Sequence, residues 1–351
     1  NRGWTLFTQA VTSTETRSRW AVILGSLVAV RFYFSPGTLT WTADAAYHTL
    51  YAWIAGEAFR SGSLPVWTPL VAAGTPFLQF YGFVFFYLSG LVFAVLNDLD
   101  ITLKIVLGGA HVASGFTTYL LCRELTHSRK AGLMAAAVCV LSFWHTQQII
   151  VMGRYPVSLV YAFLPLPFWA LSIATRRKTW HGFALGGGAS LALIVLTHPG
   201  YGIWAGAFLV SLGVAFYVTQ RARRTRIVRA TVGMILVGVI LSSVLTIPIL
   251  FEGDETYLRS GFSLSGLPDP TPSQVFLWSN YNTGVGGETG ETHNWYGGYI
   301  GVSAVFLSLM GLGGAIWRRG RALPAAVWFG AFGCAFSLML MFGYRWTLVE
   351  S

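Results

Sequence analysis

Charged side chains are scarce in this sequence. Only 10% of its 351 residues are Asp, Glu, Lys or Arg, whereas 54% are hydrophobic, and the mean hydropathy is +0.59. Soluble domains carry about 25% charged residues, so this chain could not cover itself with a water-exposed surface. Apolar runs of roughly 17–25 residues, each long enough to cross the bilayer, recur along most of the length. The sequence therefore predicts an all-α, polytopic integral membrane protein and excludes a water-soluble globular domain.

Cysteine is almost as rare, with three residues in the chain. Cys122, Cys139 and Cys334 each lie within or at the edge of an apolar segment. Their spacing matches neither a zinc motif nor a disulfide framework, and buried single cysteines of this kind serve as small core residues.

Acidic residues are outnumbered by basic ones, which gives a net charge of +10. Most of the Lys and Arg residues stand in short clusters between apolar runs, as in Arg176–Lys178, Arg221–Arg229 and Arg318–Arg321. Such clusters mark cytoplasmic loops, because positive charge resists translocation. A basic face for nucleic acid would gather on one surface instead, so we expect no nucleic-acid partner.

These clusters fall on one side of the membrane if the chain crosses it nine times, within a bundle of about nine to ten spans. Arg17 and Arg19 precede the first apolar run, which reads as a signal anchor with a cytoplasmic N-terminus. Because the chain starts at Asn1 and stops soon after an apolar run, we expect both ends to be incomplete. The prediction is a single domain, 1–351, with these parts: a first span at 20–35, an outer loop at 36–100 with interfacial helices, a six-span bundle at 101–250, an outer loop at 251–296, and two last spans at 297–342. Within the bundle the spans are expected at 101–122, 131–146, 156–175, 182–198, 200–219 and 230–250.

The segment 76–96 is apolar enough to span the membrane, but one more crossing would place a later basic cluster outside. We therefore expect this segment to lie along, or dip into, the outer leaflet and return. All acidic residues except Glu15 and Glu124 then face outward.

The densest group of polar and aromatic residues lies in the first outer loop. Asp44 and His48 are four residues apart and share one face of a helix, with Tyr47 between them. Glu57 and Arg60 close the same amphipathic segment before Gly and Pro residues end it. Taken singly, Asp44 reads equally well as an acid at a helix start, His48 as a structural histidine, and Tyr47 as an interfacial belt residue.

The whole pattern resembles the GT-C superfamily of membrane glycosyltransferases, and within it the prokaryotic 6-pyruvoyl-tetrahydropterin-synthase-related membrane proteins. The likeness is carried by Asp44 to His48, Gly62 to Pro69 with Trp67, Gly153 to Pro156, Leu164 to Pro167, and Gly298 to Gly301. The resemblance places a catalytic acid on Asp44 and implies a prokaryotic cytoplasmic membrane. The expected donor is a sugar linked to a polyprenyl phosphate, embedded among membrane lipids.

In the mechanism that follows, Asp44 acts as general base on an acceptor hydroxyl, which attacks the anomeric carbon with inversion. A cation must receive the charge of the departing phosphate, and Arg154 is the candidate because guanidinium groups suit phosphate oxygens. Arg60 is the reserve. The alternatives are interfacial snorkelling for Arg154 and a surface ion pair with Glu57 for Arg60.

Acids and aromatics of the second long outer loop, 251–296, could bind sugar hydroxyls and stack on pyranose rings. These candidate substrate-binding residues are Glu288, Glu291, His293 and Trp295. The alternative is an ordinary solvated loop.

A departure from the GT-C pattern concerns metal. Several members carry a second acidic motif in the next outer loop, where this chain has His145, Gln147, Gln148 and Arg154. We therefore expect a site without a metal ion and assign no cofactor. A zinc ion bound by Asp44, His48 and His145 is the alternative.

Two other functions remain open. A transporter or flippase would show inverted repeats and charges within spans, and we find no repeat. A non-catalytic subunit of a membrane complex with a GT-C-like fold is the other alternative. The sequence does not identify the sugar or the acceptor.

Overall fold

The computed structural model describes residues 14–37, 39, 44–71, 74–253 and 329–330, and within them the fold is almost entirely helical. The helices are α2 (Thr14–Ala29), α3 (Ala45–Arg60), α4 (Val84–Leu96), α5 (Leu99–Thr126), α6 (Arg129–Leu141), α7 (Phe143–Thr146), α8 (Tyr155–Phe163), α9 (Pro165–Ala174), α10 (His181–Thr197), α11 (Pro199–Thr219) and α12 (Arg224–Glu252). Short 3-10 turns lie at Val30–Phe34 and Arg221–Arg223, and a π-helical turn at Gln147–Val151. The predicted all-α class is confirmed.

Helix boundaries follow from local chemistry. Asp98 begins α5 by accepting a hydrogen bond from the Ile101 amide at 2.9 Å, and Ser128 begins α6 by accepting one from Ala131. Both are side chains that favour the N-cap position. Asn97 ends α4 and His127 ends α5 in the left-handed conformation, with φ of 53° and 54°, which closes a helix end.

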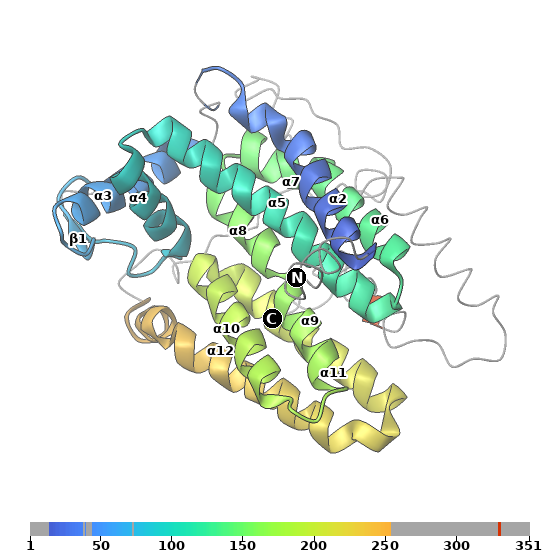
Figure 1. Cartoon of the computed structure of the whole chain (residues 1–351). Helices are drawn as coiled ribbons and strands as arrows, with labels where there is room; N and C mark the ends of the chain where they lie inside the picture. Colours follow the sequence, from blue (N-terminus) through green and yellow to red (C-terminus); the bar gives the residue numbers. More distant parts are fainter. Residues whose placement is uncertain (1–13, 38, 40–43, 72–73, 254–328, 331–351) are drawn as a thin grey trace, which may run out of the picture.

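The helices form a bundle with a smaller unit at one end (Figure 1). Helix α5 packs against α2, α6 and α8, and α10 packs against α9, α11 and α12. Helices α3 and α4 pack on each other at the end where α5 begins, together with the two-residue strands β1 (Trp67–Thr68) and β2 (Thr75–Pro76). We call this unit the α3–α4 module (residues 44–96).

Four helical stretches in the described part of the chain are long and apolar enough to cross a membrane. They are Leu99–Thr126, Tyr155–Ala174, Pro199–Thr219 and Arg221–Glu252. They overlap the predicted spans at 101–122, 156–175, 200–219 and 230–250. The two spans predicted at 297–342 lie outside the described residues. Which side each helix end faces stays a prediction.

The predicted span at 131–146 is interrupted. Helix α6 ends at Leu141, and Ser142 is extended (φ −61°, ψ 125°) before the chain turns into α7. The His145 ring donates from Nδ1 to the Cys139 carbonyl at 3.2 Å, and a side chain that bonds a nearby carbonyl offers the backbone an alternative to a continuous helix.

Helix α4 is shorter than the predicted 76–96 segment. Its 13 residues extend over about 20 Å, less than the ~30 Å of hydrocarbon. It packs along α3, where Gly56 and Gly90 allow close approach: a Cβ on Gly90 would lie 2.8 Å from the Gly56 nitrogen. Its depth in the leaflet stays a prediction.

Candidate functional site

The first turn of α3 is fixed to the loop that precedes α8. The Asp44 amide donates to the Met152 carbonyl at 3.3 Å, and His48, one turn later, bonds the Gly153 carbonyl. Gly153 has φ +64°, a conformation that favours glycine. Two segments 105 residues apart therefore meet at the start of this helix.

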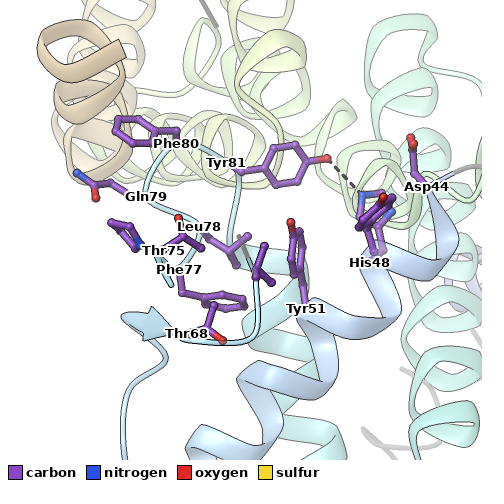
Figure 2. Close-up of a pocket in the computed structure, with 13 residues that line it drawn as sticks. Asp44, His48, Tyr51, Thr68, Thr75, Phe77, Leu78, Gln79, Phe80 and Tyr81 are labelled. Carbon is purple, nitrogen blue, oxygen red and sulfur yellow. Dashed lines mark hydrogen bonds between the residues drawn. The ribbon is translucent and has the colours of Figure 1, made fainter. Parts of the chain in front are cut away.

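His48 is held in one tautomer. Its Nδ1 lies 2.7 Å from the Gly153 oxygen, and since a carbonyl can only accept, Nδ1 carries the proton. The other nitrogen, Nε2, is then an acceptor, and the Tyr81 hydroxyl lies 3.4 Å from it (Figure 2). Burial lowers the pKa of His48, which the Gly153 bond and the Asp44 carboxylate oppose. The imidazole is therefore neutral at pH 7.

Asp44 faces Arg154 across the same junction. Arg154 Nε lies 3.7 Å from Asp44 Oδ2, and the two side chains are 31% and 54% exposed, so water screens the pair. Arg154 also donates to Gln148 Oε1 at 3.2 Å, and Gln148 is fully buried. Gln148 lies in the π-helical turn, an irregularity common at functional sites. A carboxylate and a guanidinium thus stand side by side, both reachable from solvent.

A cavity of about 520 Å³ opens beside these groups. Figure 2 shows α3 on one side, contributing Asp44, His48 and Tyr51, and the chain from Thr75 to Tyr81 on the other. Aromatic rings and neutral polar groups make up most of the remaining wall: Tyr47, Thr68, Val71, Pro76, Phe77, Leu78, Gln79 and Phe80. Ligand pockets typically combine such apolar walls with a few convergent polar groups.

Tyr81 closes the cavity over His48. Burial raises the pKa of its hydroxyl to about 12, and the Asp44 carboxylate adds to this shift. The phenol therefore stays protonated near neutral pH and can donate to His48 Nε2.

Two predicted site residues lie elsewhere on α3. Glu57 and Arg60 form an ion pair at 3.2 Å, and Arg60 also bonds Asn97 and lies over the Phe93 ring. Thirteen residues of helix separate Glu57 from Asp44, about 20 Å. The structure therefore does not bring this pair to the cavity, because the helix that begins at Asp44 carries them to its far end.

Trp67 is also absent from the cavity wall. Its side chain is 60% exposed and lies over Gly74, where an added Cβ would stand 3.0 Å from its ring. The other predicted substrate-binding residues, Glu288, Glu291, His293 and Trp295, lie outside the described residues.

His198 is a neighbour of the site that is absent from the predicted set. It lies between α10 and α11, and its ring is 6.3 Å from that of Tyr81. The chain before α4 makes this possible: a Cβ on Gly82 would stand 2.1 Å from the Thr197 oxygen. Only the Pro-Gly after His198 signals a turn in the sequence, and nothing there signals its partner.

His145 lies away from Asp44. Its ring stacks on that of His111, with centroids 3.8 Å apart and planes at 12°. In the part of the chain that the structure describes, no group of three His, Cys, Asp or Glu side chains could hold a metal ion. The alternative zinc site on Asp44, His48 and His145 is therefore not assembled.

Comparison with known proteins identifies the family and the fold. The model of the 6-pyruvoyl-tetrahydropterin synthase related domain, described as a membrane protein, matches residues 78–348. Asp44 and His48 precede the matched range. Among curated proteins, none matches.

Two solved structures of the Archaeoglobus fulgidus oligosaccharyltransferase share the fold, each at 14% identity. The apo form superposes with a TM-score of 0.56 over 91% of this chain and 47% of its own. The second is archaeal oligosaccharyltransferase AglB in complex with an inhibitory peptide and a dolichol-phosphate, with a TM-score of 0.50 over 70% of this chain and 34% of its own. This chain thus spans less than half the length of either. The fold is shared with these oligosaccharyltransferase structures, and the chain belongs to the 6-pyruvoyl-tetrahydropterin synthase-related family of membrane proteins.

Proposed function

We propose that this protein is a membrane glycosyltransferase that moves a sugar from a polyprenyl-phosphate-linked donor to an acceptor at the outer face of the cytoplasmic membrane. The observation that carries the proposal is the Asp44–Arg154 pair beside the aromatic cavity. The solved complex of AglB with a dolichol-phosphate supports a lipid-linked donor for a protein of this fold.

The two charged groups match in kind the two roles of a glycosyl transfer, a base for the acceptor and a cation for the departing phosphate. They lie 3.7 Å apart, so the pair must open for the sugar to lie between them. The acceptor oxygen attacks the anomeric carbon, the bond from that carbon to the phosphate oxygen breaks, and the acceptor proton passes to the Asp44 carboxylate. The departing phosphate gains negative charge, which the Arg154 guanidinium neutralises. A single displacement of this kind inverts the anomeric configuration.

The cavity wall suits the sugar. Aromatic side chains such as Tyr51 and Phe77 offer flat faces to a pyranose ring, and Thr75 offers a hydroxyl for hydrogen bonds with the sugar. The outer-face location rests on the basic clusters, which place the N-terminus and the loops after α5, α9 and α11 in the cytoplasm.

The test is transfer in proteoliposomes supplied with a panel of polyprenyl-phosphate-linked sugars. We expect Asp44→Asn to lower the rate by two or more orders of magnitude, because the amide cannot take the acceptor proton. Glu57→Gln is the matched control, a similar change at the far end of the same helix, and should transfer at the wild-type rate.

Two outcomes would redirect the proposal. If Asp44→Asn transfers as fast as wild type, the reaction stands but Asp44 is not its base. If folded wild type is inert with every donor, a non-catalytic subunit of a membrane complex becomes the function to pursue, and a flux assay in the same vesicles tests for a transporter.

A further inference from the structure

The hairpin beside the cavity exposes large apolar side chains. Its described residues, 64–71 and 74–76, include strands β1 and β2, and we call them the tongue. Leu64, Val66, Trp67 and Leu70 are 69%, 66%, 60% and 59% exposed. Exposed apolar patches of this kind mark surfaces that a partner or a membrane covers.

The sequence around the tongue has no charge to keep it in water. From Ser61 to Asn97, 37 residues contain no Asp, Glu, Lys, Arg or His. This stretch includes α4, which is too short to cross the bilayer, so a membrane span does not account for its lack of charge. Charged groups are costly in hydrocarbon, and an interface with another protein would tolerate a charged rim.

The described backbone of the tongue makes several local hydrogen bonds. Val66 donates to the Leu64 carbonyl and accepts from the Phe77 amide, both at 2.9 Å. The Gly74 amide donates to Val71, and the Leu70 amide to Thr68 Oγ1. Prolines at 65, 69 and 76 have no amide hydrogen to satisfy. Backbone that enters lipid must meet its hydrogen bonds internally, and these bonds meet that need for part of the tongue.

A hydrogen bond to α12 places the tongue beside the end of that helix. Gln79, three residues after it, donates to Glu252 at the end of α12. The exposed apolar stripe of α12 reaches the same point, with Ile247 and Phe251 at 53% and 80% exposure. The tongue therefore lies near a part of α12 whose apolar side chains are exposed.

From these observations we infer that the tongue inserts into the outer leaflet and that its partner is the lipid surface. Trp67 occupies the headgroup boundary that indole rings prefer, and the apolar side chains reach the edge of the acyl region, about 5–10 Å deep. Because Thr68 and Val71 belong both to the tongue and to the cavity wall, the cavity opens at the lipid surface. This inference does not depend on the reaction.

The test is nitroxide accessibility in lipid nanodiscs. Single cysteines replace Leu64, Trp67 or Leu70 in a cysteine-free background (Cys122→Ala, Cys139→Ala, Cys334→Ala), which size-exclusion chromatography confirms as folded. Ile240→Cys, 66% exposed on α12, is the lipid reference, and Lys178→Cys, exposed in a basic loop, is the water reference.

We expect the ratio of oxygen to nickel-chelate accessibility at 64, 67 and 70 to exceed the value at 178 several-fold, and to lie below that at 240. A ratio equal to that at 178 would place the tongue in water and overturn the inference. Low accessibility to both reagents would overturn it as well, because protein rather than lipid would then cover the surface.

Discussion

Two junctions in this protein are built from different contacts: the attachment of α3 to the loop before α8, and the packing of α10 on α12. Helix α3 is anchored by hydrogen bonds from Asp44 and His48 to backbone carbonyls of a distant loop, and it presents an ion pair and aromatic rings to a cavity. Helices α10 and α12 meet through glycines, with Gly188 against Val237 and Gly238 against Leu191. Small residues that admit close backbone approach are typical of helix packing in membranes.

One junction serves the packing of the bundle, and the other positions the polar groups of the candidate site. Shape alone decides the fit of α10 on α12, so a single added methyl group is felt there. Where α3 meets the loop before α8, the partly exposed Asp44–Arg154 pair adds little to stability. Substitutions should therefore divide into those that remove activity and those that remove the fold.

Arg154→Met should have the largest effect. Loss of the cation that receives phosphate charge is expected to slow transfer about 10²–10³-fold. The screened pair with Asp44 contributes little to stability, but the buried Gln148 side chain loses the donor to its Oε1, which costs about 1–3 kcal/mol. Arg154→Lys should keep part of the rate, since it retains the charge without the planar guanidinium. Single-turnover transfer and unfolding in detergent measure both; a Met variant at the wild-type rate would remove Arg154 from the site.

Gly188→Ala should lower stability and leave the transfer rate unchanged. Its Cβ would stand 2.5 Å from Val237 Cβ and 2.8 Å from the Met234 carbonyl oxygen. We expect a loss of about 1–3 kcal/mol in stability from overpacking, with normal transfer per folded molecule. Gly186→Ala on the same helix is the control, because nothing lies within 4 Å of its Cβ and alanine favours helix by up to ~1 kcal/mol. Equal unfolding temperatures for both variants would contradict this account of the packing.

The buried imidazole should make stability depend on pH. Burial lowers the pKa of His48 in the folded protein, so between that pKa and about 6.5 the unfolded chain binds more protons. Stability is therefore full above about pH 6.5 and falls as the pH drops toward the folded pKa. His48→Gln should flatten this slope, by at most about 1.4 kcal/mol per pH unit. Unfolding temperatures of both proteins between neutral and acidic pH provide the measurement, and parallel curves would count against it.

Gln79→Ala should have the smallest effect. The Gln79–Glu252 bond joins the module to α12, but it is exposed, so its loss is expected to change stability by no more than about 0.5 kcal/mol. A variant that transfers and unfolds like wild type would show that neither the module nor α12 needs this hydrogen bond. A loss as large as that of Gly188→Ala would mean that the two regions depend on each other.

Much of the local structure could be read from the sequence. The i, i+4 spacing of Asp44 and His48 predicted their shared face on α3. Arg154 was chosen for its chemistry, and the structure places it 3.7 Å from Asp44, although nothing in the sequence joins the two segments. Glu57 and Arg60 were grouped with Asp44 because they belong to one amphipathic segment, although a helix of 16 residues separates its two ends by about 24 Å. The pairing of His145 with His111 could not be predicted, because nothing local in either segment marks the other.

The sequence by itself determined that the protein lies in a lipid bilayer and that it is helical there. Apolar runs without charge can only be helices in a bilayer, where each backbone group must bond within its own segment. Tertiary structure alone decided that Gly153 and Arg154 meet α3, that Tyr81 covers His48, and that the chain from Thr75 to Tyr81 completes the cavity. These contacts depend on backbone carbonyls and on the close approach of chain segments, which every sequence offers and no residue pattern encodes.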